Sequence, residues 1–133
     1  MANESNLVTI GWLLAGADLS SHQYGLVMLS GATWVKCSAI TDQALGILQN
    51  KPTSGLAATV AVGGVSKCKL GASVTAGNSK IGPDANGAGI PKTDATHWAI
   101  GVALESVTLA ATPTGDELAS VLINGPFHAA NAS

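Results

Sequence analysis

Apolar residues in this chain occur in short runs or at alternate positions, and glycine or proline separates most of these runs. Between residues 59 and 70, apolar side chains alternate with small or polar ones, which is the period of a strand with one buried face. Gly63-Gly64 interrupts this alternation and predicts a bend, while Asn86-Gly87 is a strong hairpin-turn signal. No window sustains a 3.6-residue period, so the pattern predicts an all-β fold. Other strands are expected over residues 24–29, 33–37, 44–49, 97–105 and 117–124.

The pattern is duplicated. Gly16-Ala17-Asp18-Leu19-Ser20 recurs 55 residues later as Gly71-Ala72-Ser73-Val74-Thr75, and residues 44–47 align with 99–102 at the same offset. Residues 55–62 align with 115–122 after five or six residues of slippage. Two copies are too few for a solenoid. We therefore predict one β domain over residues 16–133, a small barrel or sandwich built from two pseudo-repeats (16–64 and 71–125), with a tail at 126–133.

Residues 1–15 are predicted to form an extended N-terminal arm. The arm is apolar after Asn6, and such a segment is able to add a strand to an open sheet edge of a neighbouring molecule. Trp12 is expected to act as an aromatic anchor in that contact, although packing against its own domain stays an open alternative. The residues expected to make the contact with a partner or another subunit are Leu7, Val8, Ile10, Trp12, Leu13 and Leu14.

Residues 7–17 also resemble the apolar part of a signal peptide. However, residues 1–6 contain no Lys or Arg and carry Glu4 where a positive charge belongs, so export is disfavoured. The run is also far shorter than the ~20 residues that span a bilayer, and no membrane partner is expected.

The composition is poor in charge. Charged residues make up 11% of the chain, compared with about 25% in typical domains, and arginine is absent. The net charge of −2 argues against a nucleic-acid partner, because nucleic-acid binding depends on lysine and arginine neutralising phosphates. A surface so poor in charge is typical of a protein that packs against other proteins, or simply of a β domain rich in small residues.

Few residues indicate chemistry. Cys37 and Cys68 lack metal-site spacing and are expected to be buried thiols. The sequence contains no phosphate-binding glycine loop and no nucleophile elbow, and its acids lie in turn-rich contexts, so we expect no enzyme, cofactor or metal site. Lys67 and Lys69 flank Cys68 near an expected bend, where a carrier domain would present a modified lysine, but they lack the flanking pattern of such turns. The histidines show no zinc-like spacing; they are His22, His97 and His128.

Three segments in order carry a family resemblance: residues 15–27, the Gly-Ile-Leu-Gln-Asn-Lys-Pro segment at 46–52, and the Ala-Val-Gly-Gly-Val segment at 61–65. Together they resemble the capsid decoration (capsid cement) proteins of tailed bacteriophages, the DUF2190 family, over about residues 6–123. The segments 90–97 and 126–133 depart from the family pattern.

This resemblance implies a structural virion protein without catalytic activity. It would be made in the cytoplasm of a bacterial host and would bind the outer surface of an icosahedral head at capsomer junctions, stabilising the expanded shell. The implied partners are the phage major capsid protein and further copies of the chain, with a homotrimer favoured. The alternative is a surface-displayed β module that binds carbohydrate or the host, for which the aromatic content of 4% is low.

Overall fold

Ten β-strands account for the regular secondary structure in the computed structural model, which describes residues 4–109 and 117–128. The predicted all-β class is confirmed. Within these ranges there is no helix, and so no helix of the length and hydropathy needed to cross a bilayer. The strands are β1 (Ser5–Ile10), β2 (Leu14–Ala15), β3 (Leu26–Ser30), β4 (Thr33–Lys36), β5 (Gly46–Leu48), β6 (Val60–Lys69), β7 (Lys80–Pro83), β8 (Gly89–Pro91), β9 (Trp98–Ala103) and β10 (Leu118–His128).

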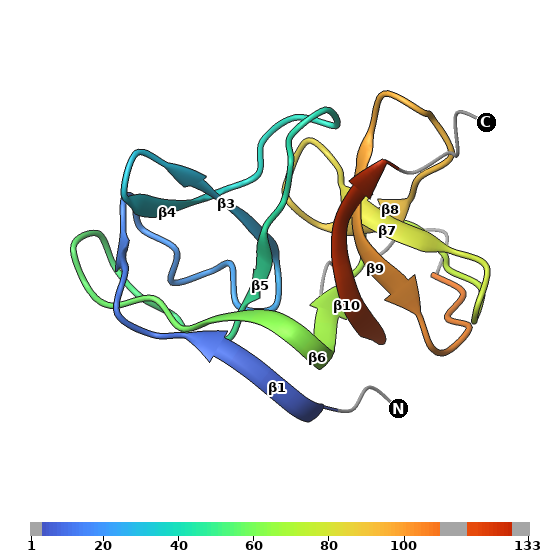
Figure 1. Cartoon of the computed structure of the whole chain (residues 1–133), viewed down its shortest axis with the longest axis horizontal. Coiled ribbons are helices and arrows are strands. Elements are labelled where there is room, and N and C mark those ends of the chain that lie inside the picture. Colours follow the sequence, from blue (N-terminus) through green and yellow to red (C-terminus); the bar gives the residue numbers. More distant parts are fainter. Residues whose placement is uncertain (1–3, 110–116, 129–133) are drawn as a thin grey trace.

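The strands form one mixed sheet whose order reads β2-β4-β3-β5-β6-β10-β9-β7-β8, and β1 pairs with β6 in addition. Leaving out β2, the order of the first half mirrors that of the second half about the β6–β10 pair. The sheet ends at β2 and β8 and does not close, so of the two predicted architectures the closed barrel is not formed. Figure 1 shows a first lobe containing β2–β5 and a second lobe containing β7–β10, with β6 crossing between them.

Equivalent positions of the two halves make equivalent hydrogen bonds. The amide of Leu19 donates to the carbonyl oxygen of Pro52 (2.9 Å), and the amide of Val74, 55 positions later, donates to that of Val107 (2.9 Å). Both expected hairpins are present, β3–β4 and β7–β8. Gly31 (φ +62°) and Gly87 (φ +76°) occupy positions in these turns where a side chain would strain the backbone. The offset seen in the sequence therefore corresponds to a repeated set of strands and turns.

The core consists of two clusters of buried side chains. Consecutive residues of one strand enter different clusters: Leu26 and Val27 of β3 do so, as do Ile47 and Leu48 of β5. This follows from the alternation of side chains across a sheet, and it means that the first lobe is covered on both faces. The first cluster also takes residues from β7, β9 and β10, so it joins the two lobes.

Strand β10 is longer than predicted. It continues through His128, so residues 126–128 of the predicted tail are strand, and the imidazole of His128 stacks on Trp98 with ring centroids 4.1 Å apart. Residues 129–133 of that tail, like residues 1–3 of the arm and 110–116 of the second pseudo-repeat, lie outside the described part of the chain.

Candidate docking surface

The N-terminal segment is extended, as predicted, and it lies along the first half of β6 of its own chain. β1 pairs with β6 in antiparallel fashion, with Ile10 opposite Val60. Beyond β1 the contact continues, because the amide of Ala58 donates to the carbonyl oxygen of Leu13 (3.0 Å). β1 and β10 lie on opposite sides of β6, because Val65 pairs with both Ser5 of β1 and Leu122 of β10. Figure 1 shows β1 at the bottom of the molecule, below β6.

The six predicted contact residues divide into two groups. Leu7 is partly buried and packs against the first core cluster, while Ile10 and Leu13 pack against the second. The other three side chains point to solvent, and their exposed fractions are 59% for Val8, 77% for Trp12 and 46% for Leu14. The value for Trp12 excludes the alternative in which this side chain packs against its own domain.

Leu56 extends this exposed surface, and the sequence analysis did not single it out. Its side chain is 58% exposed, and its carbonyl oxygen accepts a hydrogen bond from the amide of Ala15 (2.8 Å). We call Val8, Trp12, Leu14 and Leu56 the N-terminal apolar face. Neither segment that builds it contains a charged residue or a histidine over residues 5–17 and 52–66. That shared lack of charge was visible in the sequence, but the adjacency of the two segments was not.

Gly64 lies in the part of β6 that has a partner strand on each side, because its neighbours Gly63 and Val65 both pair with β1. It pairs with Ile123 of β10, whereas the preceding Gly63 pairs with Val8 of β1. Gly64 has φ +88°, and a Cβ atom there would collide with the carbonyl oxygen of Asn6 and lie 2.9 Å from that of Ser5. At the predicted bend, the backbone of β1 therefore lies too close to Gly64 for a side chain to fit.

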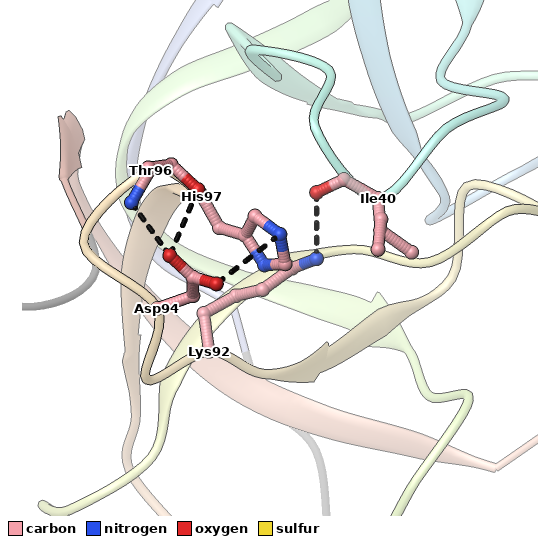
Figure 2. Close-up of polar contacts among 5 residues, drawn as sticks. All are labelled: Ile40, Lys92, Asp94, Thr96 and His97. Atoms are coloured by element: carbon pink, nitrogen blue, oxygen red, sulfur yellow. Dashed lines mark hydrogen bonds and ion pairs between the residues drawn. The ribbon is translucent and has the colours of Figure 1, made fainter.

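A buried lysine links the two lobes (Figure 2). The Lys92 side chain, after β8, is almost fully buried, and its Nζ donates to the carbonyl oxygen of Ile40 in the first lobe (2.9 Å). Burial lowers the pKa of the Lys92 ammonium. Next to it, Asp94 accepts hydrogen bonds from the amide and hydroxyl of Thr96 (2.8 Å each), which lower the pKa of its carboxyl group, and it lies 3.9 Å from Nε2 of His97. The contacts of Asp94 fix the loop after β8, and the hydrogen bond of Lys92 joins this loop to the first lobe.

The remaining polar candidates do not converge on one place. Cys37 and Cys68 are buried free thiols, as predicted, and burial raises the pKa of each to about 12. Lys67 and Lys69 lie within β6 and not in a turn, where a modified carrier lysine would be presented. Among the described residues, no group of three or more His, Cys, Asp or Glu side chains is arranged to hold a metal ion.

No family model and no curated protein sequence matches this chain, so the resemblance to the DUF2190 family stays a prediction. Among solved structures, the chain is similar to the N-terminal base of head fiber gp8.5 of bacteriophage phi29. The two are 13% identical, and the match covers 89% of this chain and 94% of that chain with a TM-score of 0.62. At this identity the match establishes a shared fold.

Proposed function

We propose that this chain is a structural protein of a phage virion that decorates the outside of the head. Support comes from the fold, which it shares over most of its length with a phage head fiber base, and from the sequence segments that resemble capsid decoration proteins. In this proposal the chain binds the major capsid protein at capsomer junctions of the expanded shell. Self-association into trimers belongs to the same proposal.

The observation that carries the proposal is the N-terminal apolar face. Interface centres in proteins are depleted of charge and enriched in aromatic residues. Here Trp12 is 77% exposed and no charge lies on either segment that presents it. A Trp side chain buries about 200 Å², so covering the exposed part of Trp12 contributes roughly 4 kcal/mol before the costs of association. That is the size of contribution expected from an anchor residue.

Stabilisation of the shell would follow from mass action. A ligand that binds the expanded lattice and not the alternative states shifts the equilibrium toward the expanded lattice. Many copies, each with a modest interface, then add up to a large effect on the shell. No catalytic group is needed for this function.

The test is binding to expanded, DNA-free heads of the phage that encodes the chain, measured by co-sedimentation. The wild type is expected to bind and to raise the temperature at which the heads disrupt. Trp12→Ser should weaken binding by about 30-fold or more, the equivalent of a 2 kcal/mol anchor. The matched control is Ile40→Ser, which also removes a half-exposed apolar side chain, but outside the face.

Point variants are preferable to deletion of residues 1–14, because deletion would also remove β1 from β6. Equal binding by Trp12→Ser and Ile40→Ser would refute the assignment of the face. Absence of binding by the wild-type chain would refute the decoration function, and hits on a glycan array would then favour the carbohydrate-binding alternative.

A further inference from the structure

Four of the six lysines gather around two adjoining hollows beside residues 17–24. The first hollow has a volume of about 550 Å³, and its wall includes Lys36 and Lys69. The second has a volume of about 250 Å³, and its wall includes Lys51 and Lys69. The ammonium group of Lys67 lies 5.5 Å from the ring centroid of Tyr24, which lines the second hollow. A chain of net charge −2 thus concentrates its positive charge in one place.

None of these four lysines forms an ion pair with an acidic residue within the described ranges. The ion pair found between described residues joins His97 and Asp94. Lys69 donates to a single carbonyl oxygen, that of Ser21 (3.1 Å), which leaves other N–H groups of its ammonium free to donate. Lys51 makes no side-chain hydrogen bond to another described residue. The site therefore holds positive charge that no described contact with a carboxylate of residues 4–109 or 117–128 compensates.

Two carboxylates line the first hollow, and local turns engage both. Asp18 accepts a hydrogen bond from the amide of Ser20 (3.0 Å). Asp84 accepts hydrogen bonds from the amides of Asn86 (2.7 Å) and Ala88 (2.9 Å). The second hollow has no acidic residue in its described lining, which comprises Ser20, Ser21, Gln23, Tyr24, Lys51, Lys69 and Leu118. The two hollows thus differ in charge: the first is mixed and the second is positive.

We propose that the two hollows bind an extended acidic segment of a protein partner, with one carboxylate side chain seated in the second hollow between Lys51 and Lys69. A volume of about 250 Å³ is below the usual 300–1,000 Å³ of small-molecule sites, so it suits one side chain of a longer ligand. The hydroxyl of Ser21 supplies a further donor for a carboxylate. A nucleic acid fits less well, because Asp18 and Asp84 would repel its phosphates and the chain has no arginine.

This inference rests on the proposed function only in identifying the major capsid protein as the partner. Its own test is a titration of the full-length chain with hexaglutamate, followed by amide chemical shifts in NMR spectra at 50 mM salt. Residues 20–24 and Lys69 should shift with hexaglutamate and not with hexaglutamine, and 300 mM salt should reverse most of the effect.

Lys51→Gln and Lys69→Gln should each weaken hexaglutamate binding by about threefold, as expected for partly exposed charge pairs. Lys80→Gln is the matched control, because Lys80 lies on β7 and lines neither hollow. Lys51 is exposed and has no side-chain hydrogen bond within the described part of the chain, so its replacement leaves the fold intact. Equal shifts with hexaglutamine, or equal losses in Lys51→Gln and Lys80→Gln, would overturn the inference.

The two proposals fail separately. A chain that binds hexaglutamate but not heads retains this site and loses the decoration function. If the wild-type chain binds heads, and the Lys51→Gln and Lys69→Gln variants bind heads and hexaglutamate equally well, the decoration function stands and this site is refuted.

Discussion

Replacing Gly64 with alanine tests whether β1 is held on β6 by a backbone approach that only glycine permits. An added Cβ would collide with the carbonyl oxygen of Asn6, and because the obstacle is backbone, no side-chain rotation relieves it. Gly55 provides a matched control. Its φ of +85° is close to the +88° of Gly64, but a Cβ there has nothing within 4 Å. The two alanine variants thus share the backbone strain and differ in the collision.

The magnitudes separate the two variants. A non-glycine residue at positive φ costs roughly 1–2 kcal/mol, partly offset by about 0.4–1 kcal/mol because alanine restricts the unfolded chain. Gly55→Ala should therefore lower the free energy of unfolding by about 1 kcal/mol. Gly64→Ala must also displace β1, which uncovers part of Leu7 and Ile10, two side chains that pack against the core. At about 1 kcal/mol each, this adds about 2 kcal/mol, for a total of about 3 kcal/mol.

Denaturant unfolding measures the difference in stability, and amide hydrogen exchange locates it. Exchange of the β1 amides should accelerate in Gly64→Ala relative to Gly55→Ala, while the amides of β3 and β5 exchange alike in both variants. If both variants lose the same stability and β1 exchanges equally in each, the close approach at Gly64 does not hold the strand.

Three further predictions concern buried groups. Burial lowers the pKa of His22 below its usual value near 6.5, and the charges of Lys36 and Lys69 lower it further. The hydrogen bond to the Leu26 carbonyl and the charge of Asp84 raise the pKa but do not outweigh burial. As the pH falls, the unfolded chain therefore binds the proton before the folded chain does, and the free energy of unfolding should fall as pH drops from 7 through 6. Urea titrations should show this decrease in the wild type and in the control His128→Gln, and a smaller decrease in His22→Gln. Cys37 and Cys68, with pKa values raised to about 12, should resist a thiol reagent at pH 8 in the native protein and react fully once it is unfolded. Lys92→Ala should lower the free energy of unfolding by about 2 kcal/mol, because it removes the hydrogen bond to the Ile40 carbonyl. The control Lys80→Ala should change it by less than about 0.5 kcal/mol. An equally small change in Lys92→Ala would contradict a role of Lys92 in joining the lobes.

Local signals predicted the strands well because they depend on neighbours in the chain. Ser30-Gly31-Ala32 and Asn86-Gly87 mark turns whose glycines adopt positive φ, and both hairpins follow from them. The 55-residue offset likewise reflects hydrogen bonds that recur in both halves. Features of this kind are readable because a turn or an alternating strand imposes its residue pattern within a few positions.

Long-range placement was not readable. The apolar run at 7–14 predicts an extended segment, but alternation does not specify which sheet edge receives it, and the receiving edge on β6 lies about 50 residues away. The lysine hollows were missed for the same reason: Lys36, Lys51 and Lys69 are far apart in sequence and meet only when β6 lies beside the loop at 17–24. The sequence therefore identified which residues are unusual and left their neighbours undetermined.

The N-terminal apolar face and the lysine hollows are close enough for one partner to cover both. Lys51 and Leu56 lie on the same loop, and five residues of fully extended chain span at most about 18 Å. An ordinary interface of about 800 Å² per partner is about 32 Å across, so it reaches from one site to the other. No hydrogen bond or cation–π contact described in the structure joins Trp12 to Lys51, and their effects on head binding should therefore add. The double variant Trp12→Ser with Lys51→Gln should weaken co-sedimentation by the product of the single effects, about 90-fold if they are 30-fold and threefold. A double variant no weaker than Trp12→Ser alone would mean that the partner on the apolar face does not reach the hollows.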